Sequence, residues 1–159
     1  GEPGEIVVQG TLVMDGYRDP ELTAEAFKGG WLHTGDVAVR DPDGFLRIVD
    51  RTKDMIISGG FNIYPRDIEN VIAEHPAVAE VAVIGVPHEK WGEAVHAVIV
   101  LKPGTSASEE ELCGPVAARK GNYQAPKSVA FVEAIPQTPV GKPDKKALRA
   151  QYAQAATAA

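Results

Sequence analysis

Two apolar runs near the middle of the chain limit its possible folds more than any other feature. They are VAEVAVIGV at residues 78–86 and EAVHAVIVL at residues 93–101. Short runs rich in valine and isoleucine are typical of buried strands. Both runs fall well short of the roughly 18 apolar residues that a membrane span needs. We therefore expect a soluble protein without a membrane span, built around a sheet that contains these two strands.

Helical patterns alternate with the strand-like runs from about residue 51 onward. Pro65 can occupy a first helical turn, and apolar residues at helical spacing follow it until Pro76, which predicts a helix over about 65–75. Ser108 and Glu111 have the spacing of a capping box, so a second helix should begin there and end near residue 121. The pair Gly114-Pro115 inside this helix predicts a kink or an early break.

The last third of the chain adds one strand and one helix to this pattern. SVAFVEAI at 128–135 reads as a strand, and Pro143 with Asp144 should open a short basic helix whose alanine-rich end frays from about residue 152. The order of elements predicts an α+β domain over 51–159, with a central β-sheet covered by helices.

The first fifty residues have a different texture, with many glycines and short strand-like runs. GEIVVQG, DVAVRD and FLRIVD read as strands, the last two joined in a hairpin by the turn Pro42-Asp43-Gly44. PELTAEAFKGG at 20–30 reads as a short helix with Thr23 as a candidate cap and a glycine pair as its stop. We place a domain boundary near residue 50, with β-rich residues 1–50 before it.

Charge and cysteine usage exclude several classes of protein. The chain has 16 Lys plus Arg against 22 Asp plus Glu, a net charge of −6, which argues against a nucleic-acid partner. One cysteine permits no internal disulfide, and no leader precedes the first strand, so the expected compartment is the cytoplasm. The four histidines lack metal-ligand spacing, and we expect no metal site. Because the chain starts at Gly1 without a methionine, we expect it to be a piece of a longer protein.

Three motifs can carry chemistry. GWLHTGD at 30–36 should present the Asp36 carboxylate on a loop between strands, where it could accept hydrogen bonds from ribose hydroxyls, although a turn or cap is the commoner role. DRTKDMIISGGFNIYP at 50–65 holds Arg51, whose planar fork suits a sugar or phosphate, and a glycine pair that lets a ligand approach the backbone. The plain alternative is a charged linker followed by a β-turn.

The third motif is IPQTPVGKPDKKALR at 135–149. It places Lys142 on a loop bounded by glycine and proline, and further cations follow on a short helix. Residues 142–149 contain four cations and one anion, a local charge of +3, which indicates an anion site. Most lysine-rich helices are only solvated surface, so the motif alone does not name a ligand.

In this order and spacing the motifs closely resemble the C-terminal part of the adenylate-forming acyl-CoA synthetases, the superfamily of firefly luciferase and nonribosomal peptide adenylation domains. GVPHEKWGEAV adds to the resemblance, which covers nearly the whole chain. It implies that Asp36 and Arg51 hold the ribose hydroxyls of ATP and of the acyl-adenylate. It also implies that Lys53 lies at a hinge about which a small, mobile C-terminal domain rotates.

The resemblance assigns the two half-reactions to two further segments. Lys142 matches the lysine of the adenylation step, where a fixed ammonium stabilises charge near the α-phosphate. After rotation, Ser58, Gly59, Gly60 and Phe61 match the loop that lines the pantetheine tunnel for thioester formation.

The intact protein implied by this resemblance is an ATP-dependent acid–CoA ligase of fatty acid metabolism, acting on a fatty or aromatic acid. It would use ATP, Mg²⁺ and CoA, none of them held tightly by this chain alone. The family's phosphate loop, adenine-stacking aromatic, magnesium-binding acid and carboxylate pocket are absent from the sequence. We therefore expect residues 1–50 to be the tail of a large N-terminal domain, which is the chain's natural partner, and the isolated chain to be inactive.

Two alternatives stay open. The first is an adenylation enzyme that loads a carrier protein, since a carrier arm and CoA present the same pantetheine thiol. Whether the reaction depends on CoA or on a carrier protein distinguishes this enzyme from a CoA ligase. A noncatalytic module that binds nucleotide or a protein partner through its basic end is a rival of another class. An upstream phosphate-loop sequence in the same reading frame would exclude this second rival.

Overall fold

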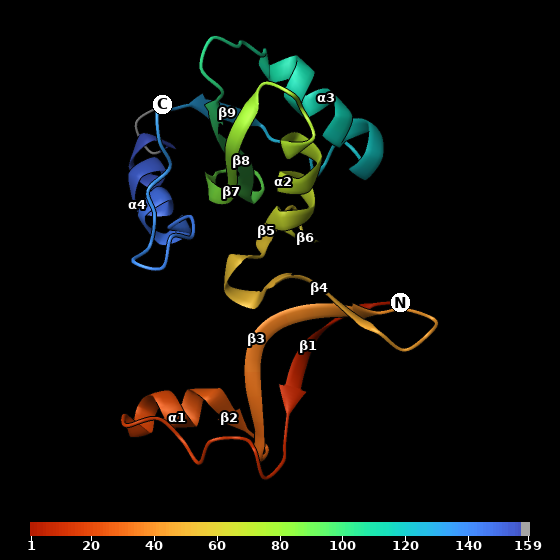
Figure 1. The fold of residues 1–159 in the computed structure, drawn as a ribbon, viewed down its shortest axis with the longest axis vertical. Helices are drawn as coiled ribbons and strands as arrows, with labels where there is room; N and C mark the ends of the chain where they lie inside the picture. Colours follow the sequence, from red (N-terminus) through yellow and green to blue (C-terminus); the bar gives the residue numbers. More distant parts are fainter. Residues whose placement is uncertain (157–159) are drawn as a thin grey trace. The chain divides into compact units, whose positions relative to one another are not determined.

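The computed structural model describes residues 1–156, with the side chains of residues 1–153, and divides the chain into two compact units. Residues 1–53 form the first unit and residues from 54 onward form the second. Both units combine strands and helices in an α+β arrangement (Figure 1). None of the described helices has the length and apolar character that a membrane crossing requires.

The first unit is an antiparallel sheet built on one long strand. Strand β3 pairs with β1 on one edge and with both β2 and β4 on the other. Its elements in chain order are β1 (Pro3–Val8), α1 (Pro20–Ala26), β2 (Phe27–Lys28), β3 (Trp31–Arg40) and β4 (Leu46–Arg51), followed by a 3₁₀ turn, η1 (Thr52–Asp54), that leads into the second unit.

The local signals in this unit are mostly as predicted. The β3–β4 connection turns at Gly44, whose φ of +92° favours glycine, so the expected hairpin is confirmed. The cap of α1 was assigned wrongly, because Asp19 rather than Thr23 is the N-cap: its carboxylate accepts hydrogen bonds from the backbone N–H groups of Glu21 and Leu22. The Thr23 hydroxyl instead ties the helix to the backbone of Tyr17.

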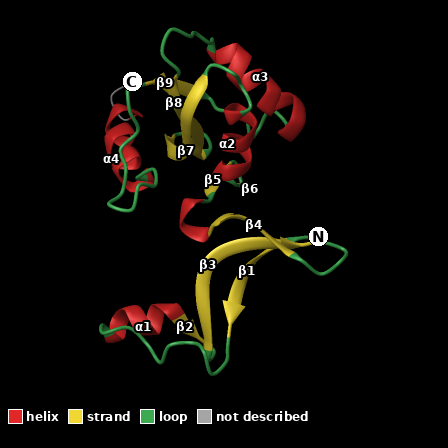
Figure 2. Ribbon diagram, viewed as in Figure 1, coloured by secondary structure: helices red, strands yellow, loops and turns green. Residues whose placement is uncertain are grey.

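The second unit is a five-stranded sheet with helices on both faces (Figure 2). Strand β8 pairs antiparallel with β7 along one edge, and with β5 and the parallel strand β9 along the other. The elements are β5 (Ile56–Ser58), β6 (Phe61–Ile63), α2 (Pro65–Ala73), β7 (Val78–His88), β8 (Gly92–Leu101), α3 (Glu109–Lys120), β9 (Ser128–Phe131) and α4 (Lys145–Ala156).

The two apolar runs are strands β7 and β8, and their side chains enter two separate cores. Val83 and Val95 face α2 and α3, whereas Ile84 and Val98 face the side covered by α4. Successive side chains of a strand point to opposite faces, so a strand covered on both faces needs apolar residues at nearly every position. This explains why the runs are continuous rather than alternating.

One expectation about the helices needs correction. Helix α3 runs unbroken through Pro115, because its capping box is formed and Leu112 and Val116 are fully buried on either side of the proline. Helix α4 extends to Ala156 and residues 157–159 lie outside the described part, so the fraying expected from about residue 152 stays a prediction. The predicted strand over 128–135 is also shorter, ending at residue 131.

A histidine is buried in the core beneath α4. His96 is 6% exposed; its Nδ1 lies 2.7 Å from the Ser128 hydroxyl, and its Nε2 has no hydrogen-bond partner among the described residues. Its ring lies 4.5 Å from that of Tyr152. Burial lowers the pKa of His96, because a charged imidazole would lose its hydration here.

We predict that the free energy of unfolding falls as pH drops below about 6.5, where the unfolded chain gains a proton that the folded chain refuses. Urea midpoints at pH 7.5 and 5.5 should therefore differ more in the wild type than in His96→Gln. The other three histidines are kept in the variant and serve as the internal control. Equal midpoint differences in the two proteins would show that His96 does not carry the effect.

Candidate functional site

Asp36 and Arg51 lie directly opposite each other on neighbouring strands of the first unit. They are register partners in the β3–β4 pair, and Arg51 Nε donates a 2.8 Å hydrogen bond to Asp36 Oδ1. Both side chains remain partly exposed, at 52% for Arg51 and 29% for Asp36. The pairing leaves a carboxylate and a guanidinium side by side at the surface, a combination that can both accept hydrogen bonds from hydroxyls and donate them.

Asp36 was expected on a loop between strands, but it lies within β3. The backbone before it is nevertheless irregular, since Gly35 has a φ of +73° and the β1–β3 register shifts nearby. The Glu5 carboxylate holds this irregular segment: it lies 2.7 Å from His33 Nδ1 and accepts the Gly35 N–H at 3.0 Å. The hydrogen bond with His33 is the main cause of a lowered pKa at Glu5.

The segment predicted to act as a hinge contains the boundary between the units. Lys53 is the middle residue of η1 and the last residue of the first unit. Asp54 is the first residue of the second unit, and its carboxylate forms an ion pair with Arg149 on α4. The second unit is therefore tied to its own terminal helix at the point where the chain enters it.

The glycine pair forms the tight turn of a small hairpin. Gly59 and Gly60 have φ values of +57° and +85° and join β5 to β6, as expected for a two-residue turn that favours glycine at both positions. Space around Gly60 is open, since a Cβ there would meet no atom within 4 Å. Ser58 is buried, whereas Phe61 is 57% exposed, with its ring 5.0 Å from that of Tyr123.

A cationic aromatic cluster lies beside this turn. The Gly59 N–H donates a 2.9 Å hydrogen bond to the carbonyl of Trp91, whose ring stacks on His88 at 4.2 Å. The Nζ atoms of Lys90 and Lys127 lie 5.9 and 5.8 Å from the centre of the Trp91 ring. Cations at this distance are attracted to an aromatic face. The Trp91 ring therefore has two positive charges beside it.

The sequence motifs assign no role to Trp91 or to either lysine of this cluster. Lys127 comes from a loop far along the chain and reaches the ring only through the pairing of β9 with β8. The GVPHEKWGEAV motif marks His88 and Trp91, but no local pattern marks Lys127. Only the tertiary fold brings these residues together.

Lys142 lies at the end of a closed turn with a well-defined backbone. Thr138 N–H donates to the Lys142 carbonyl at 2.7 Å, and the Lys142 N–H donates to the Thr138 hydroxyl at 3.2 Å. Gly141 has a φ of +75°, which the turn requires. Lys142 itself is exposed. The turn therefore fixes the backbone of Lys142 and leaves its side chain at the surface.

The anion site expected over 142–149 is smaller than its charge suggested. Lys145 and Arg149 are one helical turn apart on α4 and form ion pairs with Glu69 and Asp54. Their charges are thus compensated within the second unit. The exposed cations of the motif are Lys142 and Lys146.

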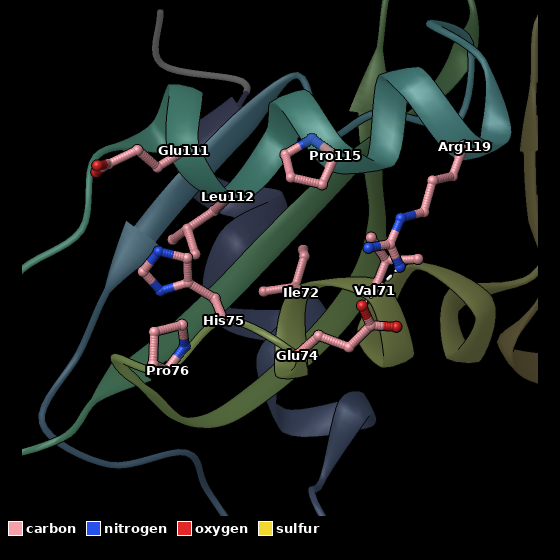
Figure 3. A pocket seen from close by; sticks show the side chains of 9 residues that line it. All are labelled: Val71, Ile72, Glu74, His75, Pro76, Glu111, Leu112, Pro115 and Arg119. Atoms are coloured by element: carbon pink, nitrogen blue, oxygen red, sulfur yellow. Dashed lines mark hydrogen bonds and ion pairs between the residues drawn. The ribbon is translucent and has the colours of Figure 1, made fainter.

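The cavity between α2 and α3 does not involve any of the predicted site residues. It measures about 210 Å³ and is lined by apolar side chains such as Ile72 and Leu112, with the Glu74–Arg119 ion pair at its rim (Figure 3). Residues 1–156 also contain no group of three or more acidic, histidine or cysteine side chains that could hold a metal ion. The candidate functional residues are the Asp36–Arg51 pair in the first unit and, in the second unit, the glycine turn with its cluster and Lys142.

Comparison with known proteins shows the family to which the chain belongs. Residues 67–142 match the family model of the AMP-binding enzyme C-terminal domain. The chain is 55% identical to a medium/long-chain-fatty-acid–CoA ligase of Mycobacterium tuberculosis and 49% identical to a long-chain-fatty-acid–CoA ligase of Escherichia coli. These matches cover 96% and 94% of the chain but only 28% and 27% of the relatives' lengths.

Solved structures give the same result. An amide bond synthetase from Marinactinospora thermotolerans is 45% identical with a TM-score of 0.88, over 96% of this chain and 31% of that one. ATP-bound MatB from Rhodopseudomonas palustris is 39% identical with a TM-score of 0.90, over 98% of this chain and 31% of that one. The chain therefore belongs to the adenylate-forming acyl-CoA synthetase family and corresponds to its C-terminal part, including the AMP-binding enzyme C-terminal domain at residues 67–142.

Proposed function

We propose that the protein containing this chain joins a carboxylic acid, in particular a fatty acid, to CoA through an acyl-adenylate. The observation that carries the proposal is the position of the Gly59-Gly60 turn beside Trp91, Lys90 and Lys127. An open backbone next to a cationic aromatic surface suits a slender thiol arm that ends in a nucleotide. Several curated relatives are named as acid–CoA ligases, which supports the same reaction.

In the first half-reaction a carboxylate oxygen of the acid attacks the α-phosphorus of ATP, and the bond to the β,γ-pyrophosphate breaks. We assign Lys142 to this step, because an ammonium on a fixed turn can stabilise the negative charge that builds between the two reactants. Asp36 would accept hydrogen bonds from the ribose hydroxyls. Arg51 would hold the Asp36 carboxylate in place and would also donate hydrogen bonds to the sugar.

In the second half-reaction the CoA sulfur attacks the acyl carbonyl, the acyl–phosphate bond breaks, and AMP leaves. We assign Ser58, Gly59, Gly60 and Phe61 to the wall of the channel that admits the pantetheine arm. Lys53, at the boundary between the two units, would be the hinge of a rotation. This rotation would remove Lys142 from the reacting centre after adenylation and bring the Ser58–Phe61 turn there for thioester formation. A long flexible cation can make different contacts in each of the two orientations.

The residues of this chain do not account for every substrate contact. Because residues 1–156 hold no cluster of acidic side chains suited to Mg²⁺, we derive no step through the metal. The acyl pocket and the remaining ATP contacts are assigned to the larger N-terminal domain, which residues 1–50 would complete. The isolated chain should therefore release no AMP.

The test of the overall reaction is AMP release by the full-length protein, supplied with ATP, Mg²⁺ and a panel of carboxylic acids. AMP release that requires both an acid and CoA supports the proposal. An amine that replaces CoA as the acceptor would instead indicate an amide-forming enzyme, the reaction named for one structural relative. Release only with a carrier protein would indicate a loading enzyme. Inactivity with every acceptor would reopen the noncatalytic binding module.

The cationic aromatic cluster would favour CoA over a carrier arm by binding the nucleotide of CoA. We predict that Lys127→Glu raises the KM for CoA about 10–100-fold, the cost of replacing a charge-assisted contact with a repulsion. The KM for free pantetheine, which has the same thiol without a nucleotide, should be unchanged.

Lys102→Glu is the matched control, because this exposed lysine follows the opposite end of β8 from the cluster. It should leave the KM values for both thiols unchanged. An equal rise for CoA and pantetheine in Lys127→Glu would show that the lysine does not contact the nucleotide.

A further inference from the structure

Three elements of the second unit meet at one carboxylate, that of Glu69 on α2. Its Oε1 accepts the backbone N–H of Val83 on β7 at 2.9 Å and lies 2.8 Å from Nζ of Lys145, the first residue of α4. Strand β7 is the last strand on its side of the sheet. Glu69 therefore joins α2, the outer edge of the sheet and the start of α4.

This ion pair is more sheltered from water than most others in the described part. The side chains of Lys145 and Glu69 are 15% and 17% exposed. Those of Arg119 and Glu74, which join α2 to α3, are 53% and 58% exposed (Figure 3). Water and salt screen an exposed pair, whereas a sheltered pair with an added backbone hydrogen bond holds its groups in one arrangement.

Lys145 is only three residues from Lys142, and the segment between them is short and well held. Asp144 N–H donates to the Pro136 carbonyl at 2.7 Å, and Pro143 bridges to Gln137, so the turn that carries Lys142 is closed at its base. The chain leaves this base directly into Lys145. Any movement of Lys145 away from Glu69 would move the base of the turn with it.

We propose that Glu69 and Lys145 are positioning residues for Lys142, holding the base of its turn in the place that adenylation requires. The inference rests on the proposed role of Lys142. We assign neither residue a contact with substrate. Their effect acts through the backbone of the turn and is confined to the half-reaction that uses Lys142.

The test uses Glu69→Gln and Lys145→Met in the full-length protein. The glutamine keeps an oxygen for the Val83 N–H but removes the charge, and the methionine keeps the length of the lysine stem. We expect kcat for acyl-adenylate formation to fall about 10–100-fold, as a displacement of about 1 Å can cause. Thioester formation from supplied acyl-adenylate should be unchanged. Lys145→Arg, which keeps the charge, should restore most of the adenylation rate.

Glu74→Gln is the matched control, since it breaks an ion pair of the same unit away from the lysine turn, and both half-reactions should stay at the wild-type rate. Equal loss of both half-reactions in Glu69→Gln and Lys145→Met, or no loss in either, would overturn the inference. If Lys142→Ala abolishes adenylation while these variants do not, only the positioning role fails. If Lys142→Ala itself leaves adenylation intact, the proposed function of Lys142 fails first.

Discussion

Replacing Lys142 with alanine is expected to slow acyl-adenylate formation by the full-length protein about 10²–10³-fold, the usual cost of losing one preorganised charge-stabilising group. The turn that carries Lys142 is closed by bonds from Thr138 and by the base at Pro143, so the substitution should remove the ammonium without disturbing the backbone. Pyrophosphate release in the presence of ATP and acid measures this step directly.

The second half-reaction provides the contrast. Thioester formation from supplied acyl-adenylate and CoA should proceed at the wild-type rate in Lys142→Ala, because that step uses the Ser58–Phe61 turn instead. Lys146→Ala is the matched control: it removes another exposed lysine four residues away and should affect neither step. Equal loss of both half-reactions in Lys142→Ala would contradict the assigned role.

The second large effect concerns stability. Leu148→Ala should lower the free energy of unfolding of the second unit by about 3–5 kcal/mol, the range for a large aliphatic side chain removed from a packed core. Leu148 is 1% exposed and belongs to the core between α4 and the sheet, together with Ile84 and Val98. No other α4 residue with a described side chain is fully buried, so the helix depends strongly on this contact.

Urea unfolding followed by Trp91 fluorescence, with Trp31 replaced by phenylalanine, would report the second unit alone. Val140→Ala is the control, because Val140 is 79% exposed on the nearby turn and its truncation should change stability by less than about 0.5 kcal/mol. A loss below 1 kcal/mol for Leu148→Ala would mean that α4 is not held by its buried leucine.

Much of the fold was predictable because its signals are local. The capping box at Ser108, the proline that opens α2 and the glycine turns each act within a few residues, and all are confirmed. The strands β7 and β8 were recognisable because burial on both faces demands continuous apolar residues. These features require no knowledge of distant parts of the chain.

The failures arise where a distant residue decides the outcome. Asp36 lies in a strand rather than a loop because β4 pairs with that segment, and Arg51 is its register partner. Helix α3 continues through Pro115 because the sheet buries Leu112 and Val116 on either side. Neither outcome can be read from the local sequence.

The candidate site shows the same division. Motifs drew attention to Asp36, Arg51, the glycine pair and Lys142, whereas Lys53, Ser58 and Phe61 came only from the family resemblance. The roles of all these residues remain proposals. The neighbours that complete the site, such as Lys127 beside Trp91 and Glu69 beside Lys145, are joined only by tertiary contacts. The local charge also suggested too large an anion site, because two of the cations on α4 are paired with carboxylates of the same unit.

The carboxylate of Glu69 also bears on how the protein behaves at high concentration. A terminal strand with unpaired backbone groups can recruit a strand from another molecule and so begin aggregation. Strand β7 is such a strand, and Glu69 occupies the Val83 N–H at the centre of its outer edge. A side chain that organises the unit internally thus also obstructs the edge through which two copies would associate.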